Sequence, residues 1–382
     1  MKRQLYEAVH ADFQSSYRSF IAREIEPHYA TWERAGIVDR GLFQAAGRAG
    51  FIGMEIPEDL GGGGVRDYRF NTIMAETAGE LGVLNAVMGL SLHNDVALPY
   101  LLHSATDEQR RRWLPGFCAG DLVVAIAMTE PAMGSDLASM QTTAIRDGDD
   151  YVINGAKTFI TNGINCDLVI VACKTDPAER HRGISLIAVE ADRPGFGRGR
   201  NLDKIGQHCQ DTAELSFTDV RVPVTNRLGA EGTGFRQLVG NLPQERLSIS
   251  IAAVPAAERA FGLALGYAKE RRAFGQPIGS FQYNRFRLAE MRTELDIART
   301  YVDQQVLAHN AGELTAEDAA KGKWWTTELC KRIVDTCLQL HGGYGYMEEY
   351  PIAQIYRDVR VMTIYGGTTE IMKEIIGRSL GV

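Results

Sequence analysis

The spacing of hydrophobic and polar residues changes twice along the chain. Up to about residue 120, and again from about residue 231, apolar residues recur at helical spacing, which predicts amphipathic helices. Between residues 121 and 230, short apolar runs such as Leu168-Val169-Ile170-Val171 alternate with turn residues, which predicts β-strands. We therefore expect an α+β multidomain chain: an N-terminal α-helical domain (1–120), a middle antiparallel β domain (121–230) and a C-terminal helical bundle (231–382).

Three short segments are expected to form turns of the β domain. They are residues 147–150, Asn154-Gly155 and Pro194-Gly195. We interpret Asn154-Gly155 as the turn of a β-hairpin, because this dipeptide favours the left-handed backbone conformations that two-residue hairpin turns require.

The first residues of the chain predict one amphipathic helix. Its apolar stripe is expected to be Leu5, Val9, Phe13, Tyr17 and Phe20. Acidic residues occur in the same stretch, and transit peptides are poor in acidic residues, so we do not expect one here.

Composition excludes several classes of protein. With 382 residues, 45% of them hydrophobic, the chain can bury a large core. The net charge of −7 and the lack of a basic patch argue against binding to nucleic acid or to an anionic membrane surface. No apolar run reaches the roughly 18 residues of a membrane span. The six cysteines form no CxxC pair, so we expect reduced thiols in a cytoplasmic protein and no metal site.

No glycine motif in the chain predicts a Rossmann nucleotide site. A GxGxxG sequence after a strand is absent, and Gly342-Gly343-Tyr344-Gly345 lacks the required spacing. Residues 127–136 follow an apolar strand and offer hydroxyls and loop amides next to Gly134, which permits close approach. Such a segment is either an ordinary polar turn or a binding loop.

Glu245 also has two interpretations. With Pro243 two positions before it, it fits the start of a helix, where proline and acidic residues are favoured. It also falls on the apolar stripe formed by Leu238, Leu242, Ile249 and Ala252. A carboxylate on a buried face is costly unless it is used, and burial raises its pKa towards the value that a general base needs.

Four segments together resemble the acyl-CoA dehydrogenase family, and the resemblance covers essentially the whole chain. They are Ala127-Met128-Thr129-Glu130-Pro131, Leu242-Pro243-Gln244-Glu245-Arg246-Leu247, Gln339-Leu340-His341-Gly342-Gly343 and Ile364-Tyr365-Gly366-Gly367-Thr368. Most members of that family carry the catalytic glutamate at the position of Gly366, and a minority carry it at the position of Glu245. The chain is similar to this minority, the long-chain and isovaleryl-CoA branch, which implies that Glu245 is the base. The family fold implies a β-barrel or sandwich in the middle and a four-helix bundle at the end.

The resemblance also implies binding residues for FAD and for an acyl-CoA. The residues expected to bind FAD are Met128, Thr129, Gly134, Ser135, Phe159, Ile160, Thr161, Arg271, Gln282, Gln339, Leu340, His341, Gly342, Gly343, Thr368, Thr369 and Glu370. The residues expected to contact substrate are Ser135, Pro243, Gln244, Arg246, Leu247, Gly366 and Gly367. His93 is expected to be a structural, hydrogen-bonded histidine, and Gly82 and Gly89 are expected to leave space for an acyl chain.

The reaction implied is FAD-dependent α,β-dehydrogenation to the trans-2-enoyl-CoA, with electrons passed to an electron-transfer flavoprotein. The family also implies a homotetramer, a dimer of dimers, in which Arg271 and Gln339 lie on opposite sides of a subunit boundary around one cofactor. Two other functions fit the same residues. One is dehydrogenation of an acyl or aminoacyl group on a carrier protein, and the other is a non-catalytic flavin-fold binding protein.

Overall fold

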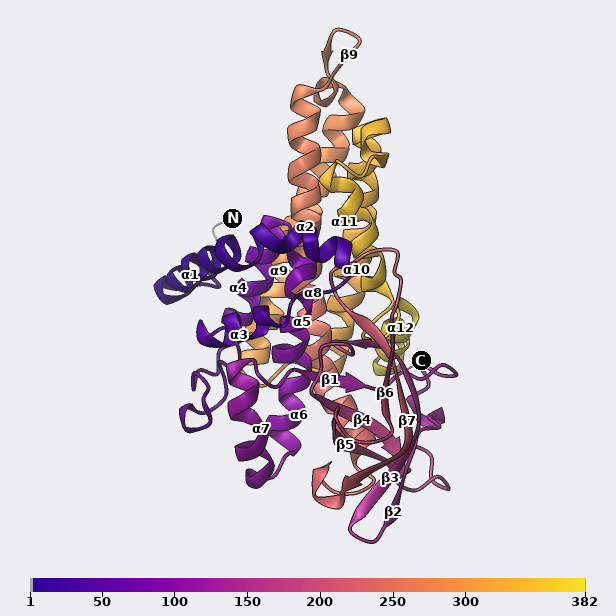
Figure 1. Ribbon diagram of the computed structural model, residues 1–382. Helices are drawn as coiled ribbons and strands as arrows, with labels where there is room; N and C mark the ends of the chain where they lie inside the picture. The colour runs from indigo at the N-terminus through magenta and orange to yellow at the C-terminus, as the bar shows by residue number, and fades with distance from the viewer. Residues whose placement is uncertain (1–2, 382) are drawn as a thin grey trace.

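A computed structural model of the chain describes residues 3–381 (Figure 1). Helices come first, a β-sheet follows, and long helices complete the chain, so the predicted three-part architecture is confirmed. The long helices extend well beyond the rest of the molecule and end in a small hairpin at the top of Figure 1. We call this part of the molecule the projecting end.

The N-terminal part is helical. Its elements are α1 (Ala8–Glu24), α2 (Glu26–Ala35), α3 (Gly41–Arg48), η1 (Glu58–Leu60), α4 (Arg69–Leu81), α5 (Leu84–Ser91), η2 (Leu92–Ala97), α6 (Leu98–Ser104) and α7 (Asp107–Ala119). The stripe predicted for the first helix is partly wrong. Leu5 precedes α1, and Val9 is 55% exposed, because His10 takes the inward position instead and is 1% exposed.

The middle part forms one mixed sheet. Its strands are β1 (Val124–Ala127), β2 (Thr143–Asp147), β3 (Asp150–Thr161), β4 (Leu168–Lys174), β5 (Ile184–Glu190), β6 (Phe196–Asn201), β7 (Thr212–Pro223) and β8 (Arg227–Leu228), with the short helices η3 (Leu137–Ser139), η4 (His181–Gly183) and η5 (Val224–Asn226). The strand order is β6-β7-β3-β2-β4-β5-β8, and β1 also pairs with β4. The sheet is not wholly antiparallel as predicted, because β4 pairs in parallel with both β1 and β2.

The predicted hairpin turn at Asn154-Gly155 is wrong. Both residues lie inside β3, and the β2–β3 turn is formed by residues 147–150 instead. The pairing of β3 with β7 shifts register between Ile153 and Gly155, which marks a bulge. Gly155 is required there, because its φ is 151° and a Cβ would lie 2.5 Å from the hydroxyl of Thr142.

The C-terminal part is a bundle of long helices. Its elements are α8 (Gly234–Glu270), β9 (Arg272–Ala273), β10 (Gln276–Pro277), η6 (Ile278–Ser280), α9 (Gln282–Asn310), α10 (Ala316–His341), η7 (Gly342–Tyr346), α11 (Pro351–Val359), η8 (Arg360–Thr363) and α12 (Thr369–Ser379). Among the described residues, α8 alone is long and apolar enough to cross a membrane. The core helices of water-soluble proteins can be equally long and apolar, and 61% of the most apolar 18-residue stretch of α8 is buried inside the structure.

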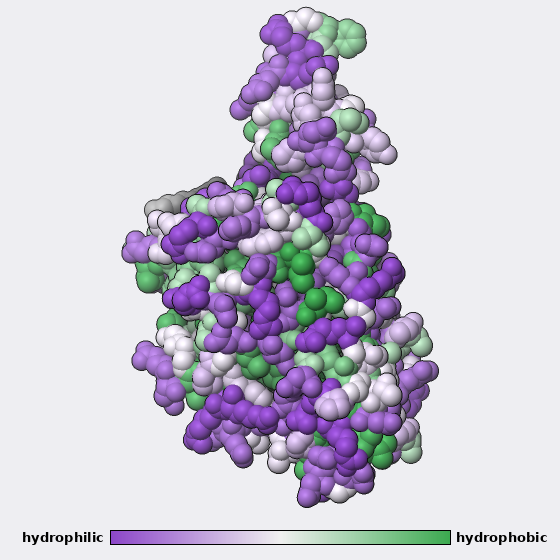
Figure 2. Space-filling view, viewed as in Figure 1, coloured by the Kyte–Doolittle hydropathy of each residue, from purple (hydrophilic) through white to green (hydrophobic). Residues whose placement is uncertain are grey.

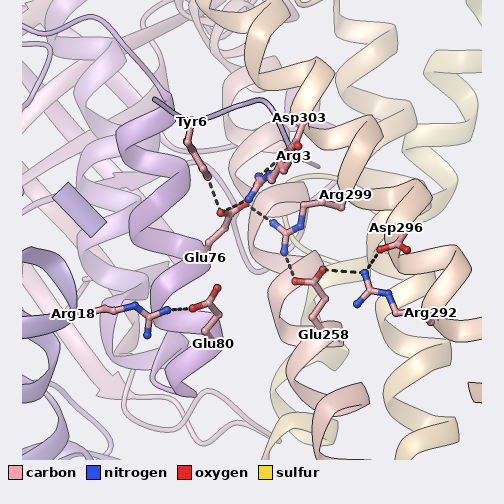
Figure 3. A network of polar contacts seen from close by, with 10 residues as sticks. All are labelled: Arg3, Tyr6, Arg18, Glu76, Glu80, Glu258, Arg292, Asp296, Arg299 and Asp303. Carbon is pink, nitrogen blue, oxygen red and sulfur yellow. Dashed lines mark hydrogen bonds and ion pairs between the residues drawn. The ribbon is translucent and has the colours of Figure 1, made fainter. Parts of the chain in front are cut away.

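A network of ion pairs joins the N-terminal helices to this bundle (Figure 3). Glu76 of α4 is 3% exposed; Arg3 and Tyr6 donate hydrogen bonds to its carboxylate, and Arg299 of α9 pairs with it. Arg299 also pairs with Glu258 of α8. These contacts fix α4 against α9 and, through Glu258, against α8.

Candidate functional site

Glu245 lies on the buried face of α8, opposite α6. The residue is 7% exposed, and its Oε1 accepts a hydrogen bond of 2.8 Å from the hydroxyl of Tyr100. Burial raises the pKa of Glu245 to about 7, against the opposing effects of the Tyr100 hydrogen bond and the positive charge of Arg246. A buried carboxylate with such a pKa can exchange a proton near neutral pH.

The helix-start interpretation of this segment is wrong. Pro243 lies inside the 37-residue helix α8, which begins nine positions earlier, at Gly234. Gln244 donates a hydrogen bond of 2.9 Å to the carbonyl of Asp95 in η2, and Leu247 is fully buried. The η2 turn is π-helical, a local form that is frequent near functional sites.

The turn at Gly366 and Gly367 lies next to this part of α8. Both glycines have left-handed conformations, with φ of 63° and 95°. Arg246 donates a hydrogen bond of 3.4 Å to the carbonyl of Gly366, and the buried amine of Lys323 donates to the carbonyl of Gly367. Within residues 3–381, the backbone N–H groups of Gly366 and Gly367 donate to no protein acceptor. The turn therefore offers two free N–H donors, while the carbonyls of the same two glycines are held by Arg246 and Lys323.

The turn leads directly into α12. Thr368 caps this helix, because its hydroxyl accepts a hydrogen bond of 3.4 Å from the N–H of Ile371. Thr369 is 8% exposed and donates to Glu328 at 2.7 Å, whereas Glu370 is exposed in the first helical turn. Of these three, Glu370 is the most exposed and Thr368 is half-buried.

A cavity of about 470 Å³ lies between α6 and the first turns of α8. Its lining is mostly polar and consists of His103, Ser104, Gly229, Ala230, Thr233, Arg236, Gln237, Gly240 and Asn241. His103 is one turn beyond Tyr100 on α6, and Asn241 is one turn before Glu245 on α8, so the cavity and the Tyr100–Glu245 pair occupy neighbouring turns of the same two helices. The glycines expected to leave space for an acyl chain do not do so, since a Cβ at Gly82 would meet Arg259 and one at Gly89 would meet Asn162.

The polar loop after β1 is anchored by a buried ion pair. Lys157 of β3 is fully buried and its amine lies 2.8 Å from Glu130 and 3.0 Å from the carbonyl of Met128. Thr158 donates through its N–H to the carbonyl of Thr129 at 2.9 Å. Beyond this anchor, Gly134 and Ser135 are exposed. The loop is therefore rigid at its base and open at Gly134 and Ser135.

The end of β3 presents an aromatic side chain in a strained conformation. Phe159 has a φ of 60° and is 67% exposed, whereas its neighbour Ile160 is 3% exposed and Thr161 is half-buried. Left-handed conformations of bulky residues are rare and are concentrated at functional sites. Because Thr158 is bonded to Thr129, this exposed ring lies beside the loop that follows β1.

The remaining residues predicted to bind flavin lie at the projecting end. Arg271 and Gln282 flank the β9–β10 hairpin, while Gln339, Leu340, His341, Gly342 and Gly343 end α10 and begin η7. The guanidinium of Arg271 lies 5.7 Å from the ring centroid of Tyr344, and His341 stacks on Tyr267 at 4.6 Å. Within one chain both segments lie together, because α8 and α10 reach this end side by side (Figure 1). The placement of Arg271 and Gln339 on opposite sides of a subunit boundary stays a prediction.

The sequence did not predict three residues of this site: Tyr100, Lys157 and Lys323. A weak signal exists for Lys323, which falls with Ala319, Ala320 and Thr327 on the buried face of α10. Tyr100 lies in an apolar stretch and gives no such signal. His93 is structural as predicted: it is fully buried, stacks on Phe117 at 3.5 Å, and burial lowers its pKa to about 3.

Comparison with known proteins identifies the family. The acyl-CoA dehydrogenase N-terminal, middle and C-terminal domains match residues 7–121, 125–220 and 232–381. The chain is 44% identical to the long-chain specific mitochondrial acyl-CoA dehydrogenase of Sus scrofa, over 99% of this chain and 88% of that protein.

Solved structures of similar proteins belong to the same family. An acyl-CoA dehydrogenase from Geobacillus kaustophilus is 48% identical, with a TM-score of 0.97 and all of both chains covered. A glutaryl-CoA dehydrogenase from Mycobacterium smegmatis in complex with FADH2 is 27% identical, with a TM-score of 0.90 over 98% of this chain and 95% of that one. The chain therefore belongs to the acyl-CoA dehydrogenase family, flavoprotein oxidoreductases that act on the CH–CH bond of acyl-CoA thioesters.

Proposed function

We propose that Glu245 is the base that removes the α-proton of the acyl-CoA thioester in this dehydrogenation. The observation that carries the proposal is a buried carboxylate whose pKa is raised to about 7, one residue before Arg246, which contacts the Gly366 turn. A general base works best when its pKa lies near the working pH. The alternative position used in the family is Gly366, which has no side chain to act as a base.

The Gly366–Gly367 turn is the proposed site for the thioester carbonyl. Its two free N–H groups are suited to the negative charge that develops on the carbonyl oxygen when the α-proton leaves. Arg246 and Lys323 fix the turn by binding its carbonyls, so the donors need not reorganise during the reaction.

We further propose that the flavin is FAD and that it lies against Phe159, Thr129 and Ser135. The surface there fits a flat aromatic group, since the Phe159 ring is exposed and a Cβ at Gly134 would have no atom within 4 Å. A bound FAD would accept the hydride that leaves the β-carbon. Phe159, Thr129 and Ser135 would hold the ring, and electrons would then pass to an electron-transfer flavoprotein.

A homotetramer is the proposed assembly. The projecting end exposes large aromatic side chains, namely Phe274, Tyr283, Phe286 and Tyr346, which are 96%, 73%, 58% and 83% exposed. Hydrophobic residues are visible at its tip in Figure 2. Such surfaces are typical of subunit contacts. In this assembly, Arg271 and residues 339–343 of one subunit would complete the FAD site on another, and light scattering that finds an active, FAD-loaded monomer would contradict it.

A cytoplasmic location remains a prediction, and the six cysteines agree with it, since all are buried free thiols.

The proposed reaction is tested by anaerobic titration of the FAD-loaded protein with acyl-CoAs of different length and branching. We expect the flavin absorbance to bleach with the preferred acyl-CoA. Bleaching only by a carrier-protein thioester would support that alternative substrate, and no bleaching by any thioester would leave a non-catalytic binding protein.

A further inference from the structure

Tyr100 and Glu245 form a polar pair between two buried helix faces. Tyr100 is fully buried, and its hydroxyl donates to Oε1 of Glu245 at 2.8 Å. The other carboxylate oxygen, Oε2, accepts no hydrogen bond from the protein within residues 3–381. The two oxygens of the proposed base are therefore not equivalent, since one is held and the other is free.

The pair has a defined place relative to the cavity. On α6, Tyr100 precedes the cavity-lining His103 by one turn, and on α8, Glu245 follows the cavity-lining Asn241 by one turn. The pair therefore lies on the turns of α6 and α8 that are next to those lining the cavity.

We propose that Tyr100 is a positioning residue, which holds Oε1 of Glu245 so that Oε2 takes the α-proton of the thioester. This inference rests on the proposed function, in which Glu245 is the base. Tyr100 touches neither substrate nor flavin in this account, and acts only through the carboxylate. A fixed carboxylate matters because small errors in the placement of a base reduce the rate strongly.

The same hydrogen bond also favours the ionised form of the carboxylate. The titratable groups that face Glu245 are Tyr100 from α6 and Arg246 from α8. Burial raises the pKa of Glu245, and both of these groups oppose that rise. Tyr100 remains a donor throughout the working range, because burial and the nearby Glu245 charge raise its own pKa well above 10. Without the Tyr100 hydroxyl, Arg246 alone would counteract the effect of burial on the pKa of Glu245, and this pKa would rise further.

The test is the pH dependence of flavin reduction in Tyr100→Phe, which keeps the ring and its packing. We expect the midpoint of the anaerobic reduction rate to move up by about one pH unit, with a rate about tenfold lower near pH 7 and partial recovery near pH 9. FAD content should not change. A purely structural role would lower the rate equally at every pH, and a midpoint that does not move would overturn the proposal.

Tyr151→Phe is the matched control. Tyr151 is also buried and donates to a glutamate, Glu231, at 2.7 Å, but it lies in the β-sheet, so its removal should leave the midpoint unchanged. Infrared titration of the Glu245 carboxyl, assigned by its loss in Glu245→Gln, gives a second measurement that does not need turnover. It should show the same upward shift in Tyr100→Phe, and an unshifted carboxyl would contradict the proposal.

Glu245→Gln separates the two hypotheses. If Glu245→Gln is inactive and Tyr100→Phe does not change the pH profile, the role of Tyr100 is wrong and the base assignment stands. If Glu245→Gln still reduces its flavin with substrate at the wild-type rate, the proposed base itself is wrong.

Discussion

Replacing Glu76 by glutamine tests the ion-pair network that joins α4 to the bundle. The carboxylate of Glu76 is buried among Arg3, Tyr6 and Arg299 (Figure 3). Burial by itself would raise the pKa of Glu76, but the hydrogen bond from Arg3 and the charge of Arg299 outweigh it, and the pKa is lowered. The folded protein therefore favours the ionised form, and Glu76→Gln removes that stabilisation.

The expected loss can be compared with that at a surface pair. Removing one member of a buried ion pair typically costs about 3–5 kcal/mol, because the partner charge stays buried. Arg3 keeps Asp303 and Arg299 keeps Glu258, so we expect the lower end, about 3 kcal/mol. The control is Glu80→Gln, one turn further along α4. Glu80 pairs with Arg18, their side chains are 48% and 42% exposed, and such pairs contribute about 0–1 kcal/mol.

Urea unfolding of the two variants at neutral pH and near pH 4 is the assay. A lowered carboxylate pKa gives stability that is present above the unfolded-state pKa and is lost as pH falls through the folded-state pKa. The gap between Glu76→Gln and Glu80→Gln should therefore be large at neutral pH and shrink in acid. Equal midpoints at neutral pH would refute the claim that this network holds the helical parts together.

Three further predictions follow from the site. Burial raises the pKa of Glu245 to about 7, so the protonated side chain stabilises the fold fully below about pH 4.5, and this stabilisation is lost as pH rises through 7. The free energy of unfolding of Glu245→Gln should therefore exceed that of wild type by about 3 kcal/mol at alkaline pH and equal it in acid. Equal Tm differences at both pH values would contradict this. Lys323→Met should slow flavin reduction at least tenfold with FAD retained, because the Gly367 carbonyl loses its donor; an unchanged stopped-flow rate would show that the turn holds itself. Gly366→Glu in a Glu245→Gln background should recover activity only to a level below wild type, since φ is 63° and a Cβ would lie 2.4 Å from Ile249; wild-type rates would show that the turn tolerates a side chain.

Periodicity predicted the parts of this fold that depend on local patterns. The helix–sheet–helix order and the buried place of Glu245 are examples, since both follow from the spacing of apolar residues. Local rules failed where packing overrides them. Pro243 suggested a helix start, yet α8 continues through it, because contacts with α4 and α10 outweigh one lost hydrogen bond. Asn154-Gly155 suggested a turn, yet it forms a bulge against β7.

The candidate site likewise contains residues that the sequence indicated and residues that only the structure reveals. Motif resemblance pointed to Glu245, to the loop after β1 and to the Gly366 turn, but it does not determine which side chains meet them across the fold. Tyr100 is separated from Glu245 by 145 positions, and Lys323 from Gly367 by 44, so only the packed structure reveals these contacts. The separation of the flavin segments between the sheet and the projecting end was likewise beyond the sequence, because it depends on where α8 and α10 end in space.

The central claim, that Glu245 is the base, is tested most directly by single-turnover flavin reduction in Glu245→Gln. FAD-loaded wild type and variant are mixed anaerobically with the acyl-CoA that bleaches the wild type best, and the flavin absorbance is followed in a stopped-flow instrument. We expect a rate lower by about 10²–10⁴-fold with FAD content unchanged, since the amide keeps the size of the side chain but cannot take the proton. Reduction at a rate close to that of wild type would contradict it.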